Sequence, residues 1–359
     1  MSRFHKLTIA KRRPETRDAV SIELAVPPAL RDTFKFAQGQ YLTLKATVDG
    51  TEERRSYSIS NALQDDKLEI TVKKVSDGRF SPFACDQLSE GCEIEVAPPA
   101  GRFSVPVSPD AEHRYLAIAA GSGITPVFSI LRTILLGEPK SEFTLIYGNR
   151  STSHVIFREA LLELKDLYPT RLNLIFVMSR EPQDVPLFYG RIDGKKVEAI
   201  VRSQIDLAGI DNVFICGPHA MAQDVAATLE RLGYDRARIK RELFAANRPA
   251  RGDAPLREDR AAPSGEIAAT VKIDGQTHSF TIDKDRQTVL EAAQAQGIEL
   301  PYSCKAGVCS TCVCKVTDGE VEMDRNYALE DYELARGFVL ACQSRPVSET
   351  LALDFDERV

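Results

Sequence analysis

Residues 304–312 read CKAGVCSTC, and a fourth cysteine follows at position 342 in the segment LACQ. Cysteine thiolates are soft ligands that bind iron and zinc in proteins. The three close cysteines are separated by small residues, which would let the loop wrap an inorganic core and aim backbone N–H groups at its sulfurs. These small residues are Ala306, Gly307, Ser310 and Thr311. The stretch therefore predicts a metal centre in the C-terminal part of the chain.

The spacing of these cysteines resembles that of plant-type ferredoxins, in which C-x4-C-x2-C and one distant cysteine hold a [2Fe-2S] cluster. A structural zinc site is the alternative, but zinc usually takes two short cysteine pairs or mixed Cys/His sets, and the sequence has neither nearby. The resemblance implies an electron-transfer domain. Its expected metal ligands are Cys304, Cys309, Cys312 and Cys342. The nearby Cys314 is expected to pack on a strand that leaves the loop.

Composition indicates a globular chain of two or three domains, since its 359 residues are 43% hydrophobic and 27% charged. The positively charged N-terminus lacks an apolar segment of signal-peptide length. The longest apolar run, residues 127–136, contains Arg132 and is too short to span a bilayer. We therefore expect a cytoplasmic protein with no membrane association, in which the eight cysteines favour metal ligation over disulfides.

Acidic residues are concentrated at the C-terminal end. Residues 265–359 contain 17 Asp and Glu against 9 Lys and Arg, a net charge of −8, whereas residues 1–264 carry a net +2. This distribution argues against nucleic-acid binding. It is consistent either with plain solvation of the domain surface or with steering of a partner that has a basic patch.

Residues 1–108 predict a small antiparallel β-barrel that binds FAD. Alternation in the segment LEITVK and Gly or Pro at the turns favour short strands. Arg55 and Tyr57 lie two residues apart and so share one face of a strand. A flavin dinucleotide offers a pyrophosphate to the guanidinium and a ring to the phenol. Strands are expected at residues 4–11, 19–26, 41–48, 53–60, 68–75 and 92–97.

The segment RSYSI at residues 55–59 resembles the flavin signature of the ferredoxin-NADP reductase superfamily. The resemblance implies that the Ser58 hydroxyl lies beside flavin N5. A second family element, G-x-x-S, is similar to the segment from Gly78 to Ser81. It precedes an expected helix at residues 82–88, where a proline at the first helical position would leave N–H groups free for the FAD pyrophosphate. For either motif alone, a tyrosine of the barrel core is the alternative interpretation.

Residues 109–246 predict a nucleotide-binding domain with a doubly wound parallel sheet. Strands are expected at residues 114–120, 143–147, 172–178 and 212–216, with helices between them. A glycine turn after the first strand lets a pyrophosphate approach the backbone at a helix N-terminus. Its sequence GSGITP has a proline where the usual fingerprint has a third glycine, but it resembles the superfamily pattern. The expected nucleotide contacts are Gly121, Gly123, Thr125 and Pro126.

Two further segments of this domain resemble superfamily motifs. Cys216, Gly217 and Pro218 follow a later strand, and the resemblance implies that Cys216 lies near the nicotinamide, although an ordinary buried cysteine is the alternative. The segment from Glu242 to Phe244 resembles the terminal acidic-x-aromatic element, whose ring covers the flavin. The resemblance thus implies a catalytic group formed by Ser58, Cys216 and Glu242.

The segment after the third expected strand predicts which nicotinamide is used. Ser179 and Arg180 place a hydroxyl and a guanidinium at the carboxyl edge of the sheet, where the adenosine ribose should lie. These donors suit a 2′-phosphate and match a family Ser-Arg pair that binds NADP, so NADPH is expected. A solvated loop arginine is the alternative, and the neighbouring Glu181 argues for caution. Arg150 after the second strand is a possible helper.

Residues 247–264 are rich in Pro, Arg, Asp and Gly without an apolar period, and predict a linker. Residues 265–359 predict a ferredoxin-like domain of the β-grasp type. We expect two strands at residues 268–273 and 277–282, a helix at residues 288–296, the cysteine loop and a last strand at residues 350–355. The fold class is thus multidomain, α+β and α/β: barrel, doubly wound sheet and ferredoxin domain.

This domain order resembles the reductase subunits of multicomponent oxygenases. Within them, the segments at residues 4–5, 16–20, 54–59 and 147–150 look most like those of the reductases of phenylacetyl-CoA epoxidase complexes. The resemblance implies electron flow from NADPH through FAD and the [2Fe-2S] cluster to a di-iron oxygenase subunit, because a flavin converts a two-electron hydride into single electrons. Two alternatives remain. The acceptor could be a ring-hydroxylating dioxygenase or another CoA-linked hydroxylase, or the C-terminal domain could be a zinc-stapled docking module on a flavoprotein.

Overall fold

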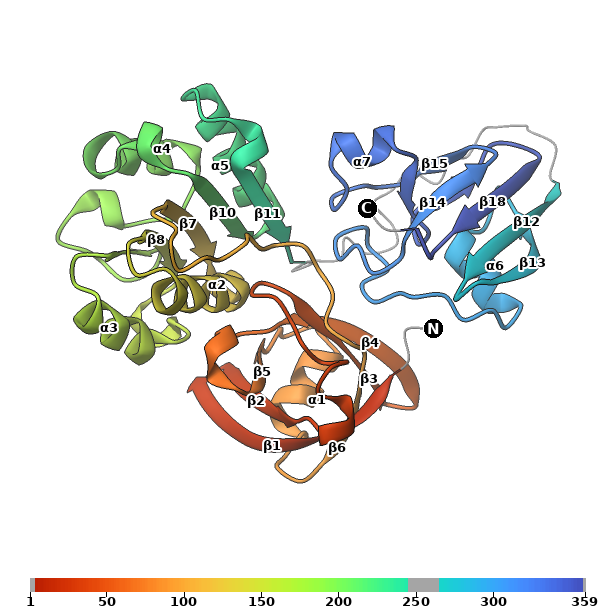
Figure 1. Cartoon of the computed structure of the whole chain (residues 1–359), viewed down its shortest axis with the longest axis horizontal. Coiled ribbons are helices and arrows are strands. Elements are labelled where there is room, and N and C mark those ends of the chain that lie inside the picture. Colours follow the sequence, from red (N-terminus) through yellow and green to blue (C-terminus); the bar gives the residue numbers. More distant parts are fainter. Residues whose placement is uncertain (1–3, 245–264, 358–359) are drawn as a thin grey trace. The chain divides into compact units, whose positions relative to one another are not determined.

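The computed structural model describes residues 4–244 and 265–357, which form two compact units (Figure 1). One unit, Phe4–Phe244, contains the barrel and the nucleotide-binding sheet, and the other contains the ferredoxin-like sheet. The expected linker at residues 247–264 lies outside the described residues. Within the described part, no helix has the length and apolar character needed to cross a membrane.

The first sheet is the expected antiparallel barrel. Its order is β4-β3-β6-β1-β2-β5, and a bridge between Ile59 and Ile70 joins the end of β4 to β5, which closes the sheet on itself. Alternate residues of β5 point into the buried core of the barrel, as its alternating sequence predicts. The strands are β1 His5–Thr16, β2 Ala19–Ala25, β3 Tyr41–Val48, β4 Thr51–Ser58, β5 Leu68–Lys73 and β6 Glu93–Val96.

Helix α1 (Phe80–Asp86) lies against the barrel and differs from the expectation in one respect. It begins at Phe80, so Pro82 is its third residue and not its first, and the argument from a proline at the first position was wrong. The helix begins earlier because Phe80, Ala84 and Cys85 are all buried in the barrel core, and burial of this apolar face decides where the helix starts.

The second sheet is parallel, with the order β11-β10-β7-β8-β9, as expected for a doubly wound domain. Four of its strands match the predicted ones closely. The fifth, β11, was not expected as a strand, because its sequence IKREL has three charged residues in five and no clear apolar alternation. The strands are β7 Arg114–Ala120, β8 Glu142–Asn149, β9 Leu172–Met178, β10 Asn212–Gly217 and β11 Ile239–Leu243.

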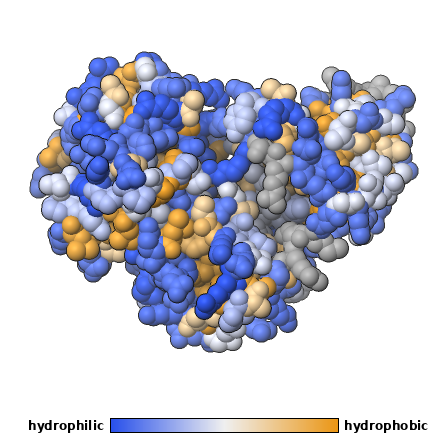
Figure 2. All heavy atoms as spheres, viewed as in Figure 1, coloured by the Kyte–Doolittle hydropathy of each residue, from blue (hydrophilic) through white to orange (hydrophobic). Residues whose placement is uncertain are grey.

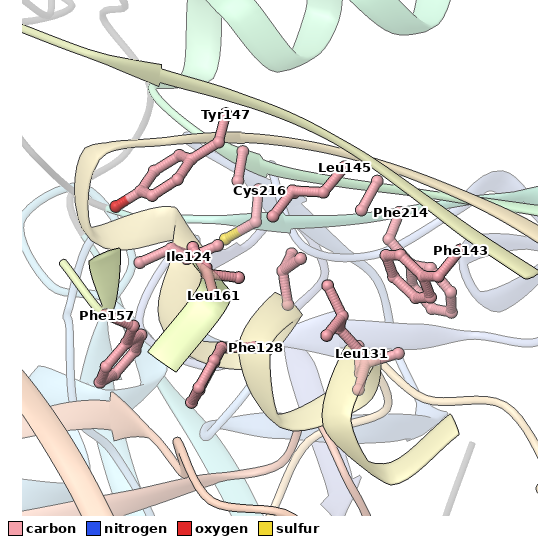
Figure 3. Packing of buried hydrophobic residues seen from close by; sticks show 14 of the residues in the cluster. Ile124, Phe128, Leu131, Phe143, Leu145, Tyr147, Phe157, Leu161, Phe214 and Cys216 are labelled. Atoms are coloured by element: carbon pink, nitrogen blue, oxygen red, sulfur yellow. The ribbon is translucent and has the colours of Figure 1, made fainter. Parts of the chain in front are cut away.

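Helices cover both faces of this sheet. Helices α2 and α3 pack on one face, where Phe128 and Phe157 stack with ring centroids 4.3 Å apart (Figure 3). Helices α4 and α5 pack on the other face, in a separate cluster of mainly aliphatic residues. The helices are α2 Ile124–Gly137, α3 Arg158–Leu167, α4 Gly194–Gln204 and α5 His219–Arg231.

The ferredoxin-like unit has a mixed sheet in the order β13-β12-β18-β14-β16, with β12 and β18 parallel. Helix α6 begins after Thr288, which caps its N-terminus together with Glu291. The short strand β16, a small sheet of β15 and β17 and the short helix α7 were not expected. The elements are β12 Glu266–Ile273, β13 Gln276–Asp283, α6 Val289–Ala295, β14 Val313–Asp318, β15 Val321–Met323, α7 Asp331–Ala335, β16 Phe338–Leu340, β17 Ser344–Pro346 and β18 Thr350–Asp354.

The surface is mainly hydrophilic on the face that Figure 2 displays, with hydrophobic residues in small groups. This agrees with the charged fraction of 27%. All eight cysteines are free of disulfides, as expected, and Cys314 is fully buried in the core of the ferredoxin-like unit.

Candidate functional site

The candidate flavin site lies on strand β4, where Arg55 and Tyr57 occupy alternate positions. The Arg55 guanidinium is partly exposed and lies 2.8 Å from the Glu53 carboxylate. Arg79 lies 3.2 Å from the same carboxylate, so two guanidinium groups meet at one acidic side chain. Arg79 and Glu53 were not among the expected site residues. The signal was present in the sequence, since Arg79 is the second residue of the G-x-x-S element.

Tyr57 packs beside Phe80, with ring centroids 5.9 Å apart. Burial raises the pKa of Tyr57 well above its usual value, although the nearby Arg55 opposes this shift. The phenol therefore stays neutral and presents an aromatic edge next to a positive group. An aromatic surface beside a cation is the arrangement that a dinucleotide with a planar ring requires.

Gly78 and Ser81 build the loop that precedes helix α1. The Val75 N–H donates to the Ser81 hydroxyl oxygen at 3.0 Å, so the serine fixes the loop. A Cβ atom at Gly78 would lie 2.9 Å from the Ser81 hydroxyl oxygen, and glycine permits this close approach. The two residues thus shape the backbone at the start of the helix.

Ser58, Glu242 and Cys216 come together although they are far apart in sequence. The Ser58 hydroxyl donates to Glu242 Oε1 at 2.8 Å, and this bond links β4 of the barrel to β11 of the parallel sheet. Cys216 on β10 is directly opposite Glu242 in the parallel pairing of the two strands, and it is fully buried. The three residues that the resemblance implied as catalytic are therefore one group.

The protein environment holds the Glu242 carboxyl in a partly protonated state. Burial raises the pKa of Glu242 to about 7, and the hydrogen bond from Ser58 lowers it. The pKa of the Cys216 thiol is raised by its burial and, to a smaller extent, by the charge of Glu242. A carboxyl with a pKa near neutrality can gain and lose a proton under physiological conditions.

The glycine turn at the carboxyl end of β7 is a short 3-10 turn, Gly121–Gly123, that leads into helix α2. Gly121 has a positive φ of 55°, and a Cβ atom at Gly123 would lie 2.1 Å from the Cys216 carbonyl oxygen. Only glycine allows this approach of the turn to β10. The Thr125 hydroxyl donates to the Ser122 carbonyl at 3.0 Å. The first N–H groups of α2 are thereby presented at a helix N-terminus, a favourable place for a phosphate.

Gly217 and Pro218 connect β10 to helix α5 at the same edge of the sheet. A Cβ atom at Gly217 would meet the Met221 side chain at 2.7 Å, and Pro218 is the residue before the first turn of α5. Phe244 follows β11 and packs, partly buried, against the same core cluster that contains Cys216. These residues therefore lie at the ends of neighbouring strands.

Ser179 and Arg180 follow β9 and continue its pairing with β8. The Ser179 N–H donates to the Asn149 carbonyl at 2.8 Å, and the Arg180 N–H donates to the Arg150 carbonyl at 2.8 Å. Both arginine side chains are exposed. Two arginines with exposed side chains are therefore neighbours in the backbone pairing at this edge of the sheet.

Glu181 is turned away from these arginines. Its carboxylate accepts the Thr152 N–H at 2.7 Å and the Thr152 hydroxyl at 2.6 Å. These hydrogen bonds lower the pKa of Glu181. The acidic neighbour that argued against a 2′-phosphate is thus engaged elsewhere, by a residue that sequence reasoning did not single out.

The four expected ligand cysteines form two pairs in the ferredoxin-like unit. The Cys304 N–H donates to Cys309 Sγ at 3.5 Å, and the Ala306 N–H donates to Cys304 Sγ at 3.3 Å. The pKa of Cys304 is lowered to about 6 by its hydrogen bond with Cys309 and by the loop N–H groups. Lys305 and Ser310 have positive φ values of 50° and 53°, a conformation that non-glycine residues rarely adopt and that often marks functional loops.

The second pair consists of Cys312 and Cys342. A hydrogen bond with Cys312 lowers the pKa of Cys342, and the Gln343 amide nitrogen lies 3.4 Å from Cys342 Sγ as a further donor. Amide donors around sulfur stabilise thiolates, the form that binds iron. The chemistry of two thiol pairs with such donors suits a [2Fe-2S] cluster, in which each iron takes two cysteines, but in the described residues no three His, Cys, Asp or Glu side chains are gathered closely enough to hold a metal ion.

Three family descriptions match the chain in the order of its sheets. Residues 6–105 match the oxidoreductase FAD-binding domain, residues 117–227 match the oxidoreductase NAD-binding domain, and residues 271–347 match the 2Fe-2S iron-sulfur cluster binding domain. The expected cofactor classes are thereby confirmed.

Two relatives and one solved structure match along nearly the whole chain. A component of 1,2-phenylacetyl-CoA epoxidase from Escherichia coli K12 is 45% identical, covering 100% of this chain and 99% of its own. The ferredoxin reductase component of 3-ketosteroid-9-alpha-monooxygenase from Rhodococcus rhodochrous is 36% identical, covering 99% and 97%. The crystal structure of phthalate dioxygenase reductase is 25% identical with a TM-score of 0.60, covering 98% of both chains.

Proposed function

The chain belongs to the family of FAD- and NAD-binding reductase components of oxygenases that carry a C-terminal 2Fe-2S domain, and on that premise we propose that it takes electrons from NADPH and delivers them to the di-iron oxygenase of a phenylacetyl-CoA epoxidase. The observation that carries the proposal is the hydrogen bond from Ser58 to Glu242, which joins the flavin strand to the nucleotide-binding sheet beside Cys216. FAD, when bound, would convert one hydride into two single electrons for the cluster.

Arg55, Arg79 and the Gly78 to Ser81 loop are the residues we assign to the FAD pyrophosphate. The support is the positive charge on two partly exposed guanidinium groups and the N-terminus of helix α1 directly behind them. Tyr57 and Phe244 supply aromatic surface for the flavin. Within residues 1–108 the barrel thus binds FAD by charge at one end and by ring packing at the other.

Ser58, Glu242 and Cys216 are the residues we assign to the reacting end of the flavin and nicotinamide. The Ser58 hydroxyl donates its proton in a hydrogen bond to Glu242 Oε1 and so orients the Glu242 carboxyl, whose own pKa of about 7 lets it gain or lose a proton near neutral pH. Cys216 is fully buried in the core cluster under the strand ends, so we assign it to supporting the nicotinamide end of the site without adding charge.

The dinucleotide is assigned to residues 121–126 and 217–218, with its adenosine end at Ser179 and Arg180. Support for NADPH comes from the two exposed arginines and from the orientation of Glu181 toward Thr152. A carboxylate that faced the ribose would favour NADH instead. The positive edge therefore favours the cofactor with a 2′-phosphate.

The four ligand cysteines are assigned to a cluster that passes electrons to the oxygenase. The acidic net charge of −8 on residues 265–359 supports a partner with a basic surface. Reductases of other oxygenases are also similar, including the ketosteroid monooxygenase component, so the identity of the acceptor needs a direct test.

The deciding experiment reconstitutes the purified chain with a phenylacetyl-CoA epoxidase oxygenase and measures NADPH-dependent oxidation of phenylacetyl-CoA. A matched reaction supplies a ketosteroid monooxygenase oxygenase with its steroid. We expect turnover only in the first reaction, with NADPH more effective than NADH. Turnover only with the steroid system would contradict the assignment of the partner, and bleaching of the flavin without any reduction of the cluster would contradict the electron path.

A further inference from the structure

Tyr147 on β8 is a completely buried tyrosine whose hydroxyl contacts the glycine turn. The hydroxyl donates to the Gly121 backbone carbonyl at 3.0 Å. Gly121 is the residue of this turn with a positive φ, so its peptide groups point where those of an ordinary residue rarely do. Figure 3 shows the Tyr147 side chain extending away from Phe143 and Phe214, with its oxygen on the side of the turn that leads into Ile124. The Tyr147 ring thus lies in the hydrophobic cluster while its hydroxyl group contacts the turn.

The environment keeps this hydroxyl as a donor. Burial raises the pKa of Tyr147 far above its usual value, and the nearby Asn149 amide and Ile156 backbone only partly oppose this shift. The phenol therefore remains protonated over the whole physiological pH range. Its proton is always available to the Gly121 carbonyl.

Asn149 lies two residues after Tyr147 and so points to the same face of the strand. It is only 7% exposed, and neither Oδ1 nor Nδ2 has a hydrogen-bond partner; among the described residues these are the only buried side-chain atoms in that condition. The amide lies close enough to act on the Tyr147 phenol without completing a hydrogen bond. An unsatisfied buried amide destabilises a fold and so calls for an explanation.

We infer that Tyr147 and Asn149 are positioning residues for nucleotide binding, which hold the glycine turn so that its N–H groups face the dinucleotide pyrophosphate. The Tyr147 hydroxyl donates to the Gly121 carbonyl, which also accepts the Ile124 N–H, and it thereby holds the turn that leads into helix α2. The Asn149 amide provides a second hydrogen-bond partner for the Tyr147 hydroxyl when the turn adjusts to the bound phosphates. The inference rests on the proposed nucleotide site at residues 121–126.

The test is Tyr147→Phe in the full-length holoprotein, which removes one oxygen and keeps the ring. We expect KM for NADPH and Kd for NADP+ to rise about threefold to tenfold, the value of one hydrogen bond, while kcat at saturation stays the same. FAD content and cluster absorbance should also be unchanged. A KM within the error of the wild-type value would overturn the role of Tyr147.

Tyr234→Phe is the matched control. The Tyr234 hydroxyl also donates to a backbone carbonyl, that of Ile210, at 3.2 Å, but it does so next to the amino end of β10, at the opposite edge of the sheet. This variant makes the same chemical change and should leave KM for NADPH unaltered. An equal rise of KM in both variants would show that loss of any buried hydroxyl in this domain loosens the site, and would refute a specific role for Tyr147.

Asn149→Leu separates positioning from structural support. Removing an unpaired amide should leave the melting temperature equal or higher, yet KM for NADPH should rise, again without change in kcat. A residue with a purely structural role would not improve stability and weaken nucleotide binding together. A lower melting temperature with unchanged KM would refute the role of Asn149.

The Gly121→Ala variant distinguishes two possible failures: that of the positioning role of Tyr147, and that of the nucleotide site at residues 121–126. A side chain at this positive φ disturbs the turn directly. If Gly121→Ala leaves NADP+ affinity unchanged, the dinucleotide does not bind at the turn and both proposals fall. If it weakens NADP+ binding and Tyr147→Phe does not, the site assignment stands and only the positioning role is refuted.

Discussion

Replacement of Glu242 by glutamine tests the proton chemistry of the site, because the change keeps the shape of the side chain and removes its charge. Burial raises the pKa of Glu242 from 4.5 to about 7, so ionising this carboxyl in the folded protein costs roughly 3–4 kcal/mol more than in water. A negative charge at this place opposes the arrival of a hydride, which brings further negative charge to the same region. Reduction of the flavin should therefore be faster when Glu242 is protonated.

The sign of the pH dependence follows from the raised pKa. Below pH 7 the Glu242 carboxyl is mostly neutral, and above pH 7 it is mostly ionised. We expect the wild-type rate constant for flavin reduction by NADPH to fall as the pH rises through about 7. In Glu242→Gln the rate constant should stay near its low-pH value across the range, since no charge can form.

Ser58→Ala provides an independent check, because the Ser58 hydrogen bond lowers the pKa of Glu242. Loss of this hydrogen bond should raise the pKa of Glu242, so the pH at which the rate constant for flavin reduction falls should move upward by roughly one to two pH units. The assay is anaerobic stopped-flow reduction from pH 5.5 to 9, with Glu163→Gln on the exposed side of α3 as control. Identical pH profiles for wild type and Glu242→Gln, or a midpoint that moves downward in Ser58→Ala, would refute the reasoning.

Three further predictions concern the cofactors. Replacing Cys304, Cys309, Cys312 or Cys342 by serine should abolish cluster absorbance and the reduction of one-electron protein acceptors, but should leave flavin reduction intact. Cys314→Ser changes a thiol buried in the core and should keep the cluster. The opposite pattern in visible spectra would show that the ligand set is wrong. Arg55→Ala should weaken FAD binding about tenfold or more, measured by flavin release on dialysis, because a charge-assisted pair with the pyrophosphate is lost; full retention would argue against the barrel site. Arg180→Ala should raise KM for NADPH about tenfold and leave KM for NADH nearly unchanged. As a companion variant, Thr152→Val should reduce the preference for NADPH, because it removes a hydrogen bond to the Glu181 carboxylate. A wild-type preference for NADH would contradict both expectations.

The sequence was sufficient for most of the fold because the periodic segments are also the buried ones. The strand from Arg114 to Ala120 was predicted to the residue, since six of its seven side chains are apolar. Strand β11 was not predicted, because the charged residues Lys240 and Arg241 interrupt the apolar pattern of its sequence. The helix at Phe80 was placed too late because Pro82 was given more weight than the burial of the phenylalanine.

The site was predictable where it follows from motifs and unpredictable where it depends on side-chain orientation. Three of the four expected ligand cysteines, Cys304, Cys309 and Cys312, could be named from spacing because they lie in one short loop, whereas Cys342 comes much later in the chain and was assigned from the resemblance. The orientation of Glu181 toward Thr152, by contrast, joins two loops 29 residues apart, and no local pattern records it. The approach of Arg79 to Glu53 likewise needs the three-dimensional structure, because it joins the loop before helix α1 to strand β4, whereas Glu53 and Arg55 lie two residues apart on one strand.

Helix α2 explains how residues from two sheets can hold one reacting geometry. Its N-terminus follows the glycine turn, and its side contacts the barrel segment that directly follows Ser58: the Ser129 hydroxyl donates to the Asn61 carbonyl at 2.7 Å, and Arg132 donates to the Asp65 carboxylate at 2.8 Å. The helix therefore fixes the flavin strand and the nucleotide turn relative to each other. Hydride transfer requires reacting atoms held in near-contact, so a shared rigid helix serves it better than two independently moving sheets. The single electrons that follow have no such requirement, which is consistent with a cluster carried in a separate compact unit.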